Sequence, residues 1–347
     1  MRRVYLDHNA TAPLRPEARA VMAAAMDLVG NPSSVHAEGR AARALVEKAR
    51  AQVAQALGAD GADVIFTSGA TEAAALAMSG RGLKCGAVEH EAVLAWAGAE
   101  LPVEVSGRVV AGDPARASVQ LANSETGVVQ VLPQGLAVSD LTQGFGKLPL
   151  AFNWLGLQMA LVSAHKLGGP KGVGALVLRR GTDLAAQIRG GGQEAGRRAG
   201  TENLIGIAGF GAAAEAAARD LADGVWDAVA VRRDEMEAAL LALVPEAGVV
   251  GCSGARLPNT SCLMLPGWKA ETQVMQMDLA GFAISAGSAC SSGKVRTSRV
   301  LRAMGFDDLA AASAIRVSIG PETTAADLLR FAEIWAAQWQ RQRTRAA

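Results

Sequence analysis

The sequence predicts an α/β protein whose mainly parallel β-sheet is covered by helices on both faces. The prediction depends on the alternation of strand-like and helix-like segments along the chain. Short apolar runs typical of buried strands, such as 64–67 and 174–178, are separated by longer segments with helical periodicity, such as 38–57. The 347 residues are 50% hydrophobic and 19% charged, which is typical of a globular protein with a large core and a second, smaller domain.

The first half of the chain is expected to contain helices and short strands in turn. Proline stands in the first turn of the first helix, and Gly58 ends the second. The expected positions are 16–28 and 38–57 for helices, 64–67 for a strand, 68–72 for a turn into the next helix, a short helix after residue 90, and 118–121 for a strand.

The second half is expected to complete a large domain and to form a small one. A boundary at 245–254 predicts a large domain of residues 13–245 and a small domain made of 1–12 and 246–347. The elements expected after 166 are strands at 174–178, 261–265, 283–286 and 315–319, and helices at 201–221, 225–244, 272–279, up to 304, and 325–340.

Charge and hydropathy exclude several classes of function. The net charge of +1 gives no support for nucleic acid or an anionic membrane as a partner. Residues 1–10 lack the apolar core of a signal peptide, and the longest uncharged run, 148–164, is too short and too polar to span a membrane. The four cysteines and four histidines show neither C-x-x-C pairs nor metal-ligand spacing. We therefore expect no metal site and a reducing location, the cytoplasm.

Lys166 stands where an apolar run ends in Ser163-Ala164-His165-Lys166 and a glycine-rich turn follows. The pattern predicts a buried strand with one amine at its end, beside a hydroxyl and an imidazole. A lysine held there can lose its proton by desolvation and form a Schiff base with a carbonyl. Taken alone, the stretch fits a basic surface loop better, because lysine is mostly a surface residue.

Other polar residues are expected at strand ends, where ligands bind in parallel α/β sheets. The turn 68–72 can bind an anion through free N–H groups and Thr71, or can be an ordinary helix cap. Asp140 can face a cationic ring nitrogen or can cap a turn. His90 can be catalytic or structural. The loop 190–201, with its two arginines, can approach a phosphate or lie on the surface.

Taken together, these stretches resemble the cysteine desulfurases, which are pyridoxal-phosphate enzymes of the class V aminotransferase group with the fold-type I architecture. The matches run from end to end of the chain in the family's order: Tyr-Leu-Asp-His-Asn-Ala-Thr (5–11), Gly-Asn-Pro-Ser-Ser (30–34), Phe-Thr-Ser-Gly-Ala-Thr-Glu (66–72), Glu-His-Glu-Ala-Val (89–93), Thr-Gly-Val-Val-Gln (126–130), Gly-Lys-Leu-Pro (146–149), Ser-Ala-His-Lys (163–166), Gly-Gly-Gly-Gln-Glu (190–194), Arg-Arg-Ala-Gly-Thr-Glu-Asn (197–203), Gly-Ser-Ala-Cys (287–290) and Ile-Arg-Val-Ser (315–318). One such motif would be weak, whereas the ordered set is specific.

The resemblance implies a role for each matched residue. Lys166 would hold pyridoxal 5'-phosphate, and His90 would stack on its ring and move protons. Arg316 and Asn31 would bind the substrate, L-cysteine. The remaining cofactor contacts implied are Ala70, Thr71, Ser163 and His165 to the phosphate, Thr201 from the second subunit of a homodimer, Asp140 to the ring nitrogen, Gln143 to the ring hydroxyl, and Ser124.

Cys290 would be the nucleophile that takes the sulfur atom, giving alanine and a persulfide for an acceptor or scaffold protein in iron–sulfur cluster assembly. Its small, polar neighbours favour a loop over the alternative of a buried core residue.

The chain departs from the family's pattern at Ser124, where asparagine is usual, at Ala195, where a basic residue is common, and in shortened segments at 80–118 and 130–140. Two alternatives therefore stay open. One is a related lyase or aminotransferase, such as a selenocysteine lyase, and the other is a low-activity homologue that serves as a partner protein.

Overall fold

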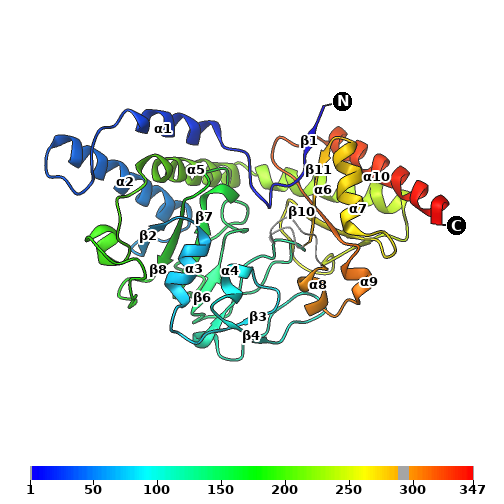
Figure 1. The fold of residues 1–347 in the computed structure, drawn as a ribbon, viewed down its shortest axis with the longest axis horizontal. Helices are drawn as coiled ribbons and strands as arrows, with labels where there is room; N and C mark the ends of the chain where they lie inside the picture. Colours follow the sequence, from blue (N-terminus) through cyan, green and yellow to red (C-terminus); the bar gives the residue numbers. More distant parts are fainter. Residues whose placement is uncertain (1, 288–296, 347) are drawn as a thin grey trace.

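The structure, a computed structural model, describes residues 2–287 and 297–346. Its elements form two groups, each with a sheet and its own helices (Figure 1). The first group carries most of residues 13–222. The second carries the N-terminal strand and the C-terminal third of the chain. In the described chain, no helix is both long and apolar enough to cross a membrane.

A sheet of seven strands forms the centre of the first group, in the order β2-β8-β7-β6-β5-β3-β4. Strand β8 is antiparallel to both of its neighbours, and the other described pairs are parallel. The sheet is therefore mainly parallel, as predicted. The strands are β2 (Asp63–Thr67), β3 (Lys84–Gly86), β4 (Gly98–Leu101), β5 (Ala117–Ser118), β6 (Val138–Asp140), β7 (Met159–Ser163) and β8 (Gly174–Leu178).

Helices cover both faces of this sheet because its strands carry apolar side chains on both sides. Val162 of β7 packs in the core under α1 (Pro16–Met26), α2 (Ala37–Ala56) and α5 (Leu204–Ala222). Leu161 packs in the opposite core with α3 (Ala70–Met78), beside α4 (Glu91–Leu94). Gly211 lets α5 approach α2 closely, since a β-carbon there would lie 2.7 Å from the Ala49 Cα.

The second group is built on a sheet in the order β12-β13-β10-β9, whose pairs are antiparallel. Strand β1 (Val4–Tyr5) pairs in parallel with β11 (Phe282–Ala283) beside it. The other elements are β9 (Gly248–Val249), β10 (Thr260–Met264), β12 (Ser285–Ala286), β13 (Ile315–Ser318), α6 (Val225–Leu243), α7 (Ala270–Leu279), α8 (Arg299–Ala303), α9 (Asp308–Ala311) and α10 (Ala325–Ala346).

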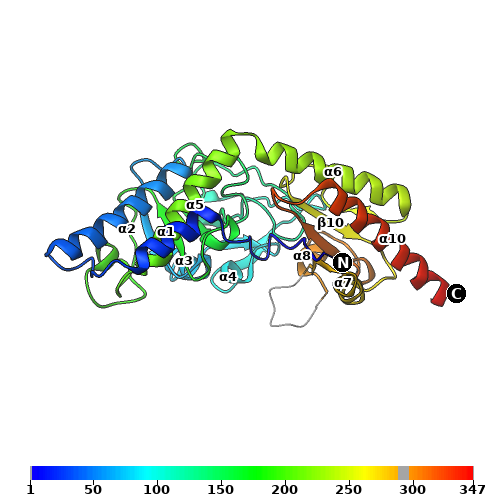
Figure 2. The same ribbon diagram turned by 90° about the horizontal axis from the view of Figure 1, so that it is seen from above.

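Helix α6 packs with the second group, as Figure 2 shows it lying beside α10. Its Trp226, Val229 and Leu240 share one core with Trp268 and Trp335. A large domain that ends at 245 remains a prediction. We propose a division near Gly224, because the residues after it contribute to the second core.

Most expected elements occur within a few residues of the predicted bounds. The strand expected at 118–121 is assigned at Ala117–Ser118, although Val119 N and Leu121 N beyond its end still donate to β6 carbonyls. The strand expected at 283–286 is two short strands that pair with different partners. Short 3-10 turns complete the described elements at Pro114–Arg116, Ala164–Lys166 and Gln193–Gly196.

Candidate active site

A cavity of about 550 Å³ lies at the carboxyl ends of the parallel strands. Because β2, β3, β5, β6 and β7 run in one direction, the segments that follow them meet at the same edge of the sheet. The N-terminal arm and β13 close the cavity from the second group. Its lining is Asn9, Ala10, Thr11, Ser68, Gly69, Ala70, Thr71, His90, Gln120, Ala122, Ser124, Asp140, Thr142, Gln143, Ser163, His165, Lys166, Lys171, Gly172 and Arg316.

Lys166 reaches this cavity from the 3-10 turn that follows β7. Its Nζ donates to two backbone carbonyls of the N-terminal arm, Asn9 O at 2.6 Å and Ala10 O at 2.9 Å. The amine is therefore held at a fixed place beside the cavity. The surface-loop alternative does not describe this lysine, because its residue is only partly exposed and lines the cavity.

Donors for an anion gather where α3 begins. Ala70 and Thr71 form the first residues of the helix, whose N–H groups and positive dipole end face the cavity. Ser163 and His165 line the same cavity. The close passage of β8 beside this turn requires Gly174, since a β-carbon there would lie 2.7 Å from the Gly69 Cα.

His165 is a neutral imidazole near pH 7. Its burial, followed by the charges of Lys166, Lys171 and Lys147, lowers its pKa to about 4. Its Nδ1 lies 3.2 Å from Thr11 Oγ1. The ring can therefore bind an anion through one N–H without adding a charge.

Asp140 is the last residue of β6, and Gln143 lies in the turn that follows it. Asp140 Oδ1 accepts from Thr142 N at 2.9 Å, so the turn orients the carboxylate toward the cavity that it lines. The side chain of Gln143 makes two hydrogen bonds, each of 3.0 Å. Its Nε2 donates to the backbone carbonyl of Asn9, and its Oε1 accepts from Lys147 Nζ.

His90 caps α4 and lines the cavity. Its Nδ1 accepts from Ala92 N at 3.1 Å, which places the ring proton of the neutral form on Nε2. The structural and catalytic alternatives for His90 are thus compatible, because the cap fixes the ring while the residue faces the cavity.

Arg316 is buried on β13 and has a carboxylate partner from the N-terminal arm. Its Nη2 lies 2.6 Å from Asp7 Oδ1, and Asp7 in turn accepts from Ser285 Oγ at 2.8 Å. Its Nη1 donates to the carbonyl of Ser124 at 3.1 Å, while its buried Nε has no partner in the described chain. Asp7 and Ser124 thus fix the guanidinium beside the cavity that Arg316 lines.

Glu125, beside Ser124, is a carboxyl whose burial raises its pKa to about 7. Ser298 Oγ donates to it at 2.6 Å, and the same hydroxyl caps α8 by accepting from Leu301 N. Arg299 continues the link by donating to the carbonyls of Ala87 and Glu89. These bonds join the start of α8 to the wall of the cavity.

Two predicted site residues in the described chain do not line this cavity, and a third lies outside the described residues. Asn31 is exposed in the α1–α2 loop, where its Oδ1 accepts from Ser33 N. Thr201 is exposed and lines a separate pocket with Arg198 and Asn203. Cys290 lies outside the described residues. The roles of all three remain predictions.

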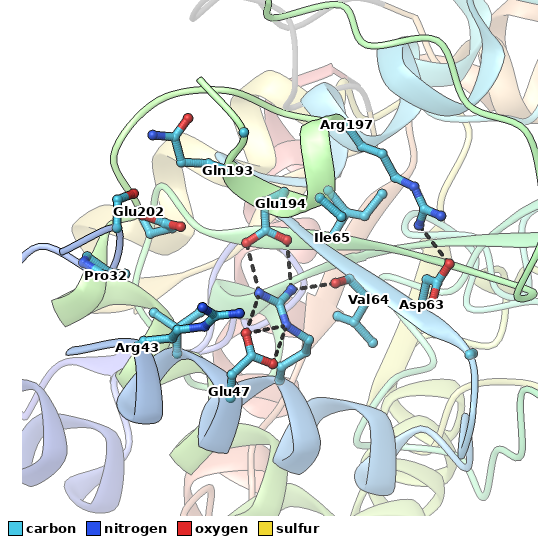
Figure 3. Close-up of a pocket in the computed structure, with 16 residues that line it drawn as sticks. Pro32, Arg43, Glu47, Asp63, Val64, Ile65, Gln193, Glu194, Arg197 and Glu202 are labelled. Carbon is cyan, nitrogen blue, oxygen red and sulfur yellow. Dashed lines mark hydrogen bonds and ion pairs between the residues drawn. The ribbon is translucent and has the colours of Figure 1, made fainter. Parts of the chain in front are cut away.

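A second cavity of about 550 Å³, shown in Figure 3, is lined by charged side chains that pair with each other. Glu194 accepts from Nη1 and Nη2 of Arg50, at 2.7 and 3.0 Å, and from Phe66 N. Arg197 pairs with Asp63. These contacts hold Glu194 at a φ of 48°, which is unusual for a residue other than glycine. This cavity therefore serves the structure of the loop 190–201.

Pyridoxal phosphate carries an aldehyde, a phosphate and a basic ring nitrogen, and the first cavity offers a partner for each. Lys166 provides an amine, the start of α3 with Ser163 provides anion donors, and Asp140 provides a carboxylate. The residues therefore fit this cofactor.

The comparison with known proteins defines the class. Residues 4–331 match the family described as aminotransferase class-V, so the chain belongs to that family. Among its relatives, a protein of Cereibacter sphaeroides named cysteine desulfurase is 41% identical, with 96% of this chain and 95% of the relative covered. A cysteine desulfurase of Frankia sp. is 39% identical, with coverages of 95% and 90%.

A solved structure agrees with these relatives. The NifS-like protein from Rickettsia africae has a TM-score of 0.88 and 31% identity, with 97% of this chain and 99% of that chain covered. The family and the fold class predicted from the sequence are confirmed.

Several residues in or beside the cavity have no role predicted from the sequence. Asn9, Thr11 and Lys147 lie in motifs that match the family. Asn9 contacts Gln143 and Thr11 contacts His165, each more than 130 residues away in the chain, whereas Lys147 contacts Gln143, which is close to it in sequence. For Lys147, the cue available in the sequence was its place in the Gly-Lys-Leu-Pro motif.

Proposed function

We propose that this protein is a pyridoxal-phosphate-dependent cysteine desulfurase that takes sulfur from L-cysteine and releases L-alanine. The observation that carries the proposal is the convergence of Lys166, Asp140, His90 and Arg316 on one cavity, from four separate elements. The names of the similar proteins support the same reaction.

The cofactor, when bound, supplies an electron sink for chemistry next to the amino group of the substrate. Lys166 would hold its aldehyde carbon, and Asp140 would keep its ring nitrogen protonated. The start of α3 would bind the phosphate together with Ser163 and His165, and a Thr201 from a second subunit would complete that site in a homodimer.

Arg316 would bind the substrate carboxylate, because a guanidinium donates two parallel bonds to such a group. Asp7 fixes the guanidinium in advance. His90 would move protons near the substrate, since its cap fixes the ring beside the cavity.

Cys290 would then act as the sulfur acceptor. Its thiolate attacks the sulfur of the bound cysteine, the carbon–sulfur bond breaks, and the bonding electron pair stays with the carbon, which takes up a proton. The products are alanine and a persulfide on Cys290. We propose that a scaffold protein of iron–sulfur cluster assembly receives this sulfur, in the cytoplasm.

The serine at 124 is compatible with this function. Its backbone carbonyl, which any residue would provide, accepts from Arg316 Nη1 and from Asn9 Nδ2. The loss of the usual asparagine side chain therefore leaves the support of Arg316 in place.

A Cys290→Ala variant tests the proposal. We expect it to keep the yellow absorbance of the bound cofactor and to release no sulfide from L-cysteine, while Cys252→Ala, at an exposed cysteine, behaves as the wild type. Persulfide should form on Cys290 alone. Keto-acid formation in place of alanine would indicate an aminotransferase, and a chain without cofactor absorbance after saturation would indicate a non-catalytic partner protein.

A further inference from the structure

Lys147 is a buried amine for which the reaction described above has no use. Only 3% of the residue is exposed, and it lies in the turn after Asp140, where Leu148 N donates to Gly144 O. A buried lysine is rare because the desolvation of an ammonium group is costly. A specific reason for its position is therefore expected.

A chain of hydrogen bonds connects Lys147 to Lys166. Lys147 Nζ donates to Gln143 Oε1 at 3.0 Å, and Gln143 Nε2 donates to Asn9 O at 3.0 Å. The same carbonyl accepts from Lys166 Nζ at 2.6 Å. The amines of Lys147 and Lys166, which follow different strands, are thus connected through the Gln143 amide and the Asn9 carbonyl.

The orientation of the Gln143 amide follows from its two partners. A carbonyl only accepts, so the amide group that faces Asn9 O must be the NH2 group. Its oxygen then faces Lys147, which donates to it. The link between the two lysines is therefore fixed in direction, and it is buried, with Asn9 and Gln143 at 1% and 6% exposure.

The electrostatic surroundings of Lys147 are positive. Burial, followed by the charges of Lys166 and Arg316, lowers the pKa of Lys147 to about 7. The influence is mutual, because two neighbouring amines each disfavour a charge on the other. Within the described chain, the titratable or charged side chains around the pair are Asp140, His90, His165 and Lys171 in the cavity, Arg316 on β13, Asp7 and His8 on the N-terminal arm, and Glu322 beside His8.

We propose that Lys147 is a positioning residue for Lys166: as a second buried amine, joined to it through Gln143 and the Asn9 carbonyl, it favours the uncharged form of Lys166 that can bond to a carbonyl. The chemistry is the activation of one lysine by another cationic group. The proposal deepens the proposed function, but the reactivity of Lys166 is measurable without a cofactor.

The test compares the wild type with Lys147→Met, which removes the charge at similar volume, and Lys147→Arg, which keeps a charge. Lys48→Met, at an exposed lysine of α2, is the matched control. Each full-length chain is freed of bound carbonyl compounds with hydroxylamine and labelled with a trace of acetic anhydride from pH 6 to 10. Peptide mass analysis then gives the labelling rate of Lys166, while circular dichroism checks the fold.

We expect Lys147→Met to label about tenfold more slowly at Lys166 near pH 7, which is the effect of an apparent pKa higher by about one unit. Lys48→Met should match the wild type, and Lys147→Arg, whose charge persists across this pH range, should label Lys166 at least as fast as the wild type. A folded Lys147→Met chain with unchanged Lys166 labelling would overturn the proposal. So would an equal loss in Lys147→Arg, because that result would assign the effect to packing.

A second measurement uses the protein with pyridoxal phosphate bound. The pH titration of the cofactor absorbance should shift upward in Lys147→Met and stay in place in Lys48→Met, and an unchanged titration would also contradict the proposal. If the wild type shows no such absorbance, the proposed function fails, whereas the labelling result still decides the role of Lys147.

Discussion

Replacing Lys147 by methionine should stabilise the protein in acid and neutral solution. The folded chain pays a free-energy penalty for a buried ammonium that the unfolded chain, with its amine in water, does not incur. Methionine fills a similar volume without charge. The increase in the free energy of unfolding is partly offset by a lost hydrogen bond, because the Oε1 of Gln143 would be buried without the lysine donor.

The magnitude follows from the pKa of Lys147, which falls from 10.5 to about 7 on folding. At about 1.4 kcal/mol per pKa unit, the penalty is roughly 5 kcal/mol. Leaving a buried amide oxygen unpaired costs about 1–3 kcal/mol. The variant should therefore be more stable than the wild type by roughly 2–4 kcal/mol at pH 6.

The pH dependence has a definite sign. Between about pH 7 and 10.5 the unfolded amine binds more protons than the folded one, so the wild type gains stability as the pH rises. The advantage of the variant should shrink over this range and reverse near its upper end, where only the lost hydrogen bond remains.

Urea unfolding of the cofactor-free chains, followed by circular dichroism at pH 6, 8 and 9.5, measures this difference. Lys48→Met should stay within about 0.5 kcal/mol of the wild type at each pH, as expected for an exposed site. A Lys147→Met chain that is less stable than the wild type at pH 6 would refute the reasoning.

Three further predictions concern carboxylates. Glu194→Gln should lower the free energy of unfolding by about 3 kcal/mol, because it leaves Arg50 without its buried partner, while Glu47→Gln on the exposed side of the same arginine should change it by less than about 1 kcal/mol in urea unfolding. The pKa of Glu125 is raised to about 7, so stability should fall as the pH rises from about 4.5 to 7, and Glu125→Gln should flatten that slope in a pH series of melts. Asp7→Asn should raise KM for L-cysteine about tenfold with a smaller change in kcat, because it loosens Arg316. A raised kcat with an unchanged KM would contradict that role, and Asp27→Asn, on the exposed end of α1, is its control.

The sheet and the strand-end residues could be predicted from local sequence. Apolar runs mark β7 and β8, and a polar turn after a buried strand predicts that Lys166 and the start of α3 lie at one edge of the sheet. Such predictions succeed because a parallel sheet brings strand ends together whatever the order of its strands.

The contacts that join distant segments could not be predicted in this way. Arg316 and Asp7 are 309 residues apart, and neither position carries a local signal of the other. Lys147 appears in the sequence as a polar residue after a glycine, and no local pattern indicates that it is buried. The bounds of the short strands also escaped prediction, because two-residue pairings such as β1 with β11 depend on tertiary contacts.

The cations of the site explain why a chain would keep a destabilising lysine. Lys166, Lys147, Lys171 and Arg316 lie in or behind one cavity, whereas one of the nearby carboxylates, Asp7, is already paired with Arg316. A ligand with a phosphate and a substrate with a carboxylate compensate that positive charge. The cations repel one another in the free chain, but they attract these anionic groups in the complex. The same charge that weakens the fold keeps an amine reactive, which is the trade-off between stability and activity expected at an active site.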